Sequence, residues 1–446
     1  MTAKNIVIIA HYFPPINSSG AKRMEAMSKY FAKAGRNVTV ISTTKLAGQG
    51  EFSEPFPDGV EVIELNWWGK VSPTPLSEVA SETASQVHPR SAWRRFKDLV
   101  MGMFGQLPDP RLPFALSFLR SRLSEPVSKA LRNADVVLAT TPPWPPLLAA
   151  VIAKRRFGSR IILDYRDQFS MCHEMPGGRF AKGIEIVVDR FLAKRGDALV
   201  AISPPMTDYY RPFNANCATI LNGYDQERLD QAKAINCWSP RRAGDPLVIR
   251  YLGLVSEGRI PQAMLAALSK KAADGTISPL SLQFEYYGEV GLMREHIDAN
   301  HPELAPFFKF LPRVSYGRSL ELAVTADYLL FAENSIPPKP GEMQSAQGIL
   351  TTKLFEYLGS GRPIVAHVAP ETLAGSFIAK AAGNVVSVDE RDFCELFSSK
   401  QFWTPGPGKV APFVPSLSRA SQADQYLRLL DDVVAGKPVT DNWALD

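Results

Sequence analysis

A lysine and a glutamate three residues apart, Lys353 and Glu356, are the clearest candidates for chemistry in this sequence. The pattern TTKLFEYLGSG predicts a helix from about Ile349 that stops at Gly-Ser-Gly, so both side chains share one face near its start. An ammonium there can neutralise a diphosphate, aided by the helix dipole, and a carboxylate can accept hydrogen bonds from two ribose hydroxyls. The alternative is an ordinary exposed Lys–Glu pair.

A second charged group lies in the segment DYRDQF, at the end of the apolar run 160–164. Asp164, Arg166 and Asp167 bring two carboxylates and a guanidinium to the end of a predicted strand. Such groups could orient a sugar or accept a proton. The alternative is a local salt bridge that caps the next segment.

A third candidate is the loop HYFPPINSSG, between a predicted strand at 6–10 and a predicted helix at 21–34. Gly20 stands where a backbone approaches a neighbour closely at a helix N-terminus, which suits an anion. The loop is not a GxGxxG fingerprint, and the sequence has no P-loop lysine motif. The alternative is a Pro/Gly-rich turn that starts a helix.

These segments must be positioned by a regular alternation of strand-like and helix-like patterns, which predicts an α/β fold with doubly wound parallel sheets. Ligands of such sheets bind beyond the carboxyl ends of the strands, where the three candidates fall. The stretch 236–246 breaks the pattern and is the best candidate for a linker. The predicted strands are 6–10, 38–42, 60–65, 135–139, 160–164, 198–202 and 219–221, then 247–253, 282–287, 328–331, 363–367 and 384–388.

Composition sets outer limits on function. A chain of 446 residues predicts two or three domains, and its net charge of +5 is too weak to indicate nucleic acid. It fits a phosphorylated ligand or an anionic membrane surface. The four cysteines have no paired spacing, which favours a reducing, cytoplasmic compartment. We expect no signal peptide and no membrane-spanning helix.

A basic amphipathic stretch, residues 90–104, follows a Ser/Pro-rich region. Trp93 and Phe96 recur on one helical face, and Arg94, Arg95 and Lys97 lie on or near the other. This stretch either packs on the domain core or lies at the inner face of the cytoplasmic membrane, with arginines and lysines on anionic headgroups.

The sequence resembles the family 4 glycosyltransferases of GT-B fold along nearly the whole chain. The resemblance runs through HYFPPINSSGAKRM, ATTPPWPP, DYRD, AISPPM, ILNGYD, YLGLVSEGR, YYGE and TTKLFEYLGSGRPIV. It is closest to a branch that builds bacterial surface polysaccharides such as capsule or O-antigen. It implies two Rossmann-like domains facing each other across a cleft: an acceptor domain at 1–240, a nucleotide-sugar domain at 241–415, and a last helix within 416–446 that returns to the first domain.

The resemblance also implies retaining transfer, without metal or cofactor, from a nucleotide diphosphate sugar to a polysaccharide or lipid-linked acceptor. Glu356 matches the glutamate that holds the ribose, and Arg259 matches a basic residue that faces the diphosphate. The predicted donor site comprises Gly20, Gly253, Arg259, Arg313, Val314, Lys353, Leu354 and Glu356. The predicted catalytic group comprises Asp164, Arg166, Asp167, Arg259 and Lys353.

The sequence departs from the family pattern at two places. Many members have two glutamates, and the first of them would fall at Gly348. In many members a lysine also follows the residue that matches Arg259, but here Pro261, Gln262 and Ala263 follow it. We therefore expect Lys353 to supply the second positive charge. Two alternatives stay open. A nucleotide-sugar epimerase of the same fold would need more carboxylates near the sugar, and a non-catalytic nucleotide-sugar binding protein is favoured by Gly348.

Overall fold

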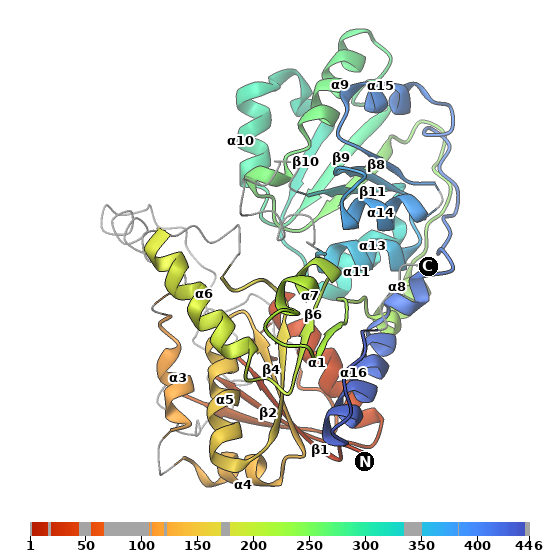
Figure 1. The fold of residues 1–446 in the computed structure, drawn as a ribbon. Helices are drawn as coiled ribbons and strands as arrows, with labels where there is room; N and C mark the ends of the chain where they lie inside the picture. Colours follow the sequence, from red (N-terminus) through yellow and green to blue (C-terminus); the bar gives the residue numbers. More distant parts are fainter. Residues whose placement is uncertain are drawn as a thin grey trace. The chain divides into compact units, whose positions relative to one another are not determined.

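The computed structural model describes residues 2–16, 19–43, 55–66, 107, 109–119, 123–170, 179–333, 350–381 and 383–441. These residues form two compact units (Figure 1). The first holds the described residues up to Asn222 and those from Arg419 onward, and the second holds those from Gly223 to Ser418. Residues 90–104 and Gly348, on which two of the predictions depend, lie outside the described ranges.

The first unit contains a parallel sheet of seven strands in the order β3-β2-β1-β4-β5-β6-β7. Successive side chains of its central strands enter two different cores, as expected for strands buried on both faces. The strands are β1 (Asn5–Ala10), β2 (Asn37–Thr43), β3 (Val60–Leu65), β4 (Val136–Thr141), β5 (Arg160–Tyr165), β6 (Ala198–Ala201) and β7 (Cys217–Thr219).

The helices of the first unit divide between the two faces of this sheet. One core joins the sheet to α1 (Ser19–Lys33) and α16 (Arg419–Val434), which lie side by side (Figure 1). The last helix of the chain therefore belongs to the first unit. The core of the other face takes in α3 (Leu112–Ser117), α4 (Glu125–Asn133), α5 (Pro145–Phe157), α6 (Arg179–Ala193) and α7 (Pro204–Tyr210).

The second unit contains a six-stranded parallel sheet in the order β10-β9-β8-β11-β12-β13. Its strands are β8 (Leu247–Leu252), β9 (Leu282–Tyr287), β10 (Phe308–Leu311), β11 (Tyr328–Ala332), β12 (Ile364–His367) and β13 (Val385–Ser387). Its helices are α8 (Gln226–Ile235), α9 (Gln262–Ala273), α10 (Gly291–Asn300), α11 (Tyr316–Thr325), α13 (Thr352–Ser360), α14 (Leu373–Lys380) and α15 (Glu390–Ser398). The two parallel sheets confirm the predicted α/β class.

The junction between the units lies at 222/223 and 418/419. The stretch 236–246, predicted as a linker, instead lies inside the second unit between α8 and β8. The reason is local packing: α8 contacts α11 and α13, so it belongs with the second sheet although it precedes that sheet in the chain.

Candidate functional site

The carboxyl end of β8 in the second unit is built around Gly253. Its φ is +134°, a backbone conformation that side chains other than glycine rarely adopt. A Cβ placed there would lie 3.2 Å from both Cε and Nζ of Lys353. Gly253 therefore leaves room for the lysine to lie against the strand end, and these two predicted donor-site residues are brought together.

Helix α13 holds Lys353 in this place. Its inward face carries Leu354, which is buried, and Tyr357, whose hydroxyl accepts a hydrogen bond of 3.0 Å from the backbone N–H of Leu252. The helix is thereby attached to the last residue of β8. The side chain of Leu354 is fully buried and anchors the helix in the core.

The ammonium of Lys353 lies 3.7 Å from the centroid of the Tyr251 ring. Its Nζ makes no hydrogen bond or ion pair with any residue that the structure describes. Burial lowers the pKa of Lys353 to about 7; Glu333 and Glu356 raise that pKa and Arg259 lowers it, without reversing the effect of burial. The fold therefore places a cation at this strand end and leaves its charge poorly compensated.

Arg259 stands beside this lysine, in a short 3-10 turn at Glu257–Arg259. Its Nε lies 3.2 Å from Oε2 of Glu333, which directly follows β11 and is only 6% exposed. β11 pairs with β8, so Glu333 and Gly253 follow neighbouring parallel strands. The sequence patterns did not identify Glu333 or Tyr251, although the rule that ligands bind beyond strand ends could have selected Glu333.

The remaining donor-site predictions are placed as follows. Glu356 is half-buried on α13, one turn after Lys353. Arg313 and Val314 lie in the connection from β10 to α11; Nη1 of Arg313 is 3.9 Å from Glu289, and its side chain is exposed. Within the second unit, two cations and two carboxylates therefore surround a strand end. Such a group can bind a phosphate through the cations and hydroxyls through a carboxylate.

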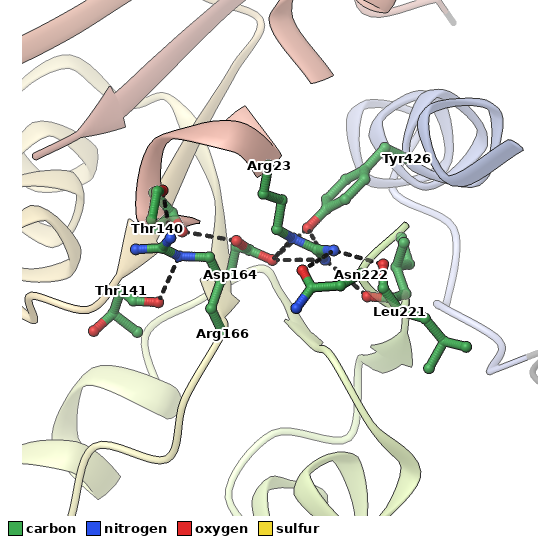
Figure 2. Close-up of polar contacts among 10 residues, drawn as sticks. Arg23, Thr140, Thr141, Asp164, Arg166, Leu221, Asn222 and Tyr426 are labelled. Carbon is green, nitrogen blue, oxygen red and sulfur yellow. Dashed lines mark hydrogen bonds and ion pairs between the residues drawn. The ribbon is translucent and has the colours of Figure 1, made fainter. Parts of the chain in front are cut away.

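The DYRDQF group of the first unit is arranged differently (Figure 2). Asp164 at the end of β5 is fully buried, and one of its oxygens accepts hydrogen bonds from Nε and Nη2 of Arg23, at 3.2 and 3.1 Å. Tyr426 of α16 donates to the same oxygen, and Thr140 donates to the other at 2.8 Å. Asp164 thus forms a structural ion pair, the alternative that the sequence left open, and it has no exposed surface to offer a substrate.

Arg23 has every feature of a satisfied internal cation. It also donates to the backbone carbonyls of Leu221 and Ile220, at 2.6 and 2.8 Å. Burial by itself would lower the pKa of Arg23, but Asp164 and Tyr426 outweigh burial and raise it. Sequence reasoning did not single out Arg23 or Tyr426, because their contacts with Asp164 span large distances in the chain.

Arg166 fixes the first turn of α1. Its guanidinium donates to the carbonyls of Thr141, Pro142 and Gly20. A Cβ at Gly20 would lie 3.2 Å from Nη1 of Arg166 and 3.0 Å from the ring of Tyr12. Gly20 thus permits a close approach, but within the first unit the approaching group is this arginine. Asp167, the next residue, is exposed.

The sequence matches the family model for a glycosyl transferase 4-like domain over residues 20–223. These residues form a glycosyl transferase 4-like domain, which confirms the resemblance to family 4 in this part of the chain. The matched range begins at Gly20 and holds Arg23 and the DYRDQF group, so the buried ion pair of Arg23 and Asp164 belongs to the glycosyltransferase domain itself.

Solved structures show the same fold along the whole length of this glycosyltransferase. Sucrose-phosphate synthase from Thermosynechococcus elongatus is 14% identical, with a TM-score of 0.61 over 97% of this chain and 100% of that one. HepE from Anabaena, in complex with UDP and glucose, is 12% identical, with a TM-score of 0.57 over 96% and 99% of the two chains. The catalytic domain of starch synthase IV from Arabidopsis thaliana, bound to ADP and acarbose, is 12% identical, with a TM-score of 0.53 over 97% and 100%. No curated protein matches the sequence.

Two further observations concern the described part of this glycosyltransferase. Its histidines, cysteines, aspartates and glutamates form no group of three that could hold a metal ion. Over the same residues, no helix combines the length and the apolar character needed to cross a membrane.

Proposed function

We propose that this glycosyltransferase moves a sugar from a nucleotide diphosphate sugar to a polysaccharide or lipid-linked acceptor, with retention of configuration and without a metal. The observation that carries the proposal is the poorly compensated ammonium of Lys353, which lies against Gly253 and near Arg259 at the end of β8. A diphosphate would give this ammonium a direct anionic partner, in addition to the more distant carboxylates of Glu333 and Glu356.

The donor would be held by residues of the second unit. Arg259 and Lys353 bind the diphosphate, the carboxylate of Glu356 accepts hydrogen bonds from the ribose hydroxyls, and Arg313 and Val314 meet the base. Two structures of similar fold, HepE and starch synthase IV, are described in complex with UDP and with ADP, which supports a donor of this class.

In the reaction, the bond between the sugar C1 and the β-phosphate oxygen breaks, and its electron pair stays on the phosphate. Arg259 and Lys353 stabilise that charge, which is the role a metal has in other transferases. The acceptor hydroxyl forms the new bond to C1 on the face that the phosphate leaves, and its proton passes to the departing phosphate. Retention follows because entry and departure use the same face.

On the acceptor side, Asp167 is the carboxylate of the DYRDQF group that reaches the surface, so we assign it the orientation of the acceptor hydroxyl. Asp164 and Arg166 position this segment from within the core. The basic pattern of residues 90–104 supports an acceptor delivered at the inner face of the cytoplasmic membrane.

The test is a panel of UDP, GDP, ADP and dTDP sugars in a thermal-shift assay, because a bound ligand raises apparent stability as ln(1 + [L]/Kd). We expect one nucleotide class to raise Tm. Glu356→Ala should lower the affinity for that donor by about tenfold or more, since hydrogen bonds to a charged group are lost. Glu395→Ala, at an exposed site on α15, is the matched control and should bind as the wild type does.

The donor that raises Tm is then incubated with candidate acceptors in EDTA. Product formation, with the anomeric configuration of the donor preserved in its NMR spectrum, supports retaining transfer without metal. Inversion, or a strict requirement for a divalent cation, would contradict the proposed mechanism. Isomerisation of the donor sugar would indicate an epimerase, and binding without turnover would indicate a binding protein.

A further inference from the structure

Helix α6 in the first unit faces the protein interior with its carboxylates and the surface with large apolar residues. Its two carboxylates face the protein interior: Glu185 is 0% exposed and Asp189 is 1% exposed. Its large apolar residues face outward at a spacing of four, three and four, a helical stripe. They are Phe180, Ile184, Val187 and Phe191, with exposed fractions of 83%, 43%, 67% and 43%.

The inward carboxylates are held by partners in the first unit. Lys182 pairs with Glu185 at 2.9 Å. Ser170 donates to Asp189 through both its hydroxyl and its backbone N–H, and the hydroxyl of Tyr210 donates at 3.1 Å. The contacts of Asp189 with Ser170 and Tyr210 fix the rotation of α6 about its axis, so the apolar stripe cannot turn inward without breaking them.

The exposed charges of this segment are all positive. Between residues 179 and 195 the only acidic residues are the two that face inward. Arg179, Arg190 and Lys194 are exposed. At 100° per residue they fall in the arc beside the apolar stripe, so the surface has an apolar stripe and a cationic stripe in parallel.

A second exposed apolar pair lies on the same face of the sheet. Leu116 and Leu119, at and just beyond the end of α3, are 44% and 63% exposed. The exposed Arg156 of α5 donates to the carbonyl of Phe118, next to them. Because α5 contacts both α3 and α6, the three helices lie together on this face (Figure 1).

We propose that the outer face of α6 docks on an anionic lipid bilayer, with its phenylalanines and aliphatic side chains among the acyl chains and its cations on the headgroups. The charge pattern selects this occupant: apolar side chains bordered by arginine and lysine, with no exposed carboxylate between residues 179 and 195, complement a negatively charged interface. This inference rests on the proposed function, because binding to a bilayer would bring the enzyme to lipid-linked acceptors.

The experiment measures co-sedimentation of the full-length protein with vesicles of phosphatidylcholine alone and of phosphatidylcholine containing phosphatidylglycerol. We expect binding to the anionic vesicles. The double variant Phe180→Ser/Val187→Ser should bind them at least about tenfold more weakly. The variant Arg179→Gln/Lys194→Gln should lose about fivefold or more and show a weaker dependence on salt.

Matched controls use equally exposed residues of the second unit. Leu280→Ser removes a leucine that is 83% exposed, and Lys309→Gln/Lys400→Gln removes two exposed lysines. Both should bind anionic vesicles as the wild type does. Circular dichroism and donor-induced thermal shifts of every variant report on folding and on the donor site.

Three results would overturn the inference. The wild type could fail to bind either kind of vesicle. The α6 variants could instead bind as well as the wild type, which would locate any membrane contact elsewhere. The wild type could also be a dimer that Phe180→Ser/Val187→Ser converts to a monomer, which would make this face an interface between copies. Donor binding in solution tests the proposed function separately, so a failure of one is distinguishable from a failure of the other.

Discussion

Both units hold a charged cluster at the end of a strand, and the two clusters differ in how the cation is compensated. In the first unit, Arg23 is surrounded by the carboxylate of Asp164, two backbone carbonyls and the hydroxyl of Tyr426, and its pKa is raised. In the second, Lys353 has an aromatic ring and no hydrogen-bonded partner among the described residues, and its pKa is lowered to about 7. Partners within the protein satisfy the first cation, and the second has no such partner among the residues that the structure describes.

This difference separates structure from function in two groups that look alike in sequence. A buried ion pair with all its hydrogen bonds made is costly to break and has nothing left to offer a ligand. A cation held in a partly desolvated place without a partner destabilises the fold by itself, and it is retained where a ligand supplies the missing charge. Four measurements can test this difference between the two clusters.

The largest effect is expected for Asp164→Asn. It leaves the charge of Arg23 buried without its carboxylate, so we expect the free energy of unfolding to fall by about 3–5 kcal/mol. Urea titration followed by circular dichroism measures this loss. Asp208→Asn, at a side chain that is 72% exposed, is the matched control and should change little. If Asp164→Asn unfolds at the same urea concentration as the wild type, Asp164 does not have the structural role assigned to it.

Lys353→Met should weaken donor binding without destabilising the fold. We expect donor affinity to fall by about 10- to 100-fold, since a charge-assisted contact to the diphosphate is lost. Without donor, Tm should not fall, and at pH 6 it should rise, because the variant no longer places an ammonium in a desolvated position. Thermal shift with and without donor measures both effects. Lys400→Met, at an exposed lysine, is the control; a loss of stability in Lys353→Met alone would make Lys353 structural.

The pH dependence of donor affinity follows from the same lysine. With a pKa of about 7, Lys353 is mostly neutral above that pH, and binding a diphosphate then requires proton uptake. Affinity should therefore decrease between pH 7 and 9, by up to about tenfold per unit. In Glu333→Gln the decrease should begin at lower pH, because Glu333 raises the pKa of Lys353. Isothermal titration calorimetry measures the profile, and a flat wild-type profile would refute the assignment.

The smallest effect is expected for Tyr426→Phe. The hydroxyl donates to Asp164 and accepts from Arg23 at 2.9 Å, but both groups keep other partners, so the loss should be about 1 kcal/mol of stability. Tyr426 is the contact of α16 with the ion pair, and urea titration should show the loss without a change in donor affinity. A weakened donor affinity would show that the two clusters are energetically linked.

Much of the fold could be predicted because strand and helix periodicity is local. The apolar runs of β1, β4 and β5 identify buried parallel strands, and the pattern around Lys353 identifies the helix that carries it. The boundary between the first and second units, at 222/223, was harder to predict. The assignment of α8 to the second unit depends on packing against α11 and α13, which no local pattern records.

Residue types at short spacing specify the α/β class, the family resemblance and the helix with Lys353 and Glu356. The environment of each charged group depends on the folded protein. Asp164 and Lys353 both follow or adjoin strand ends, but Asp164 is enclosed by Arg23 and Tyr426, 141 residues before and 262 residues after it in the chain. Electrostatic compensation depends on distance and burial in space, so only the folded chain distinguishes a satisfied charge from a poorly compensated one.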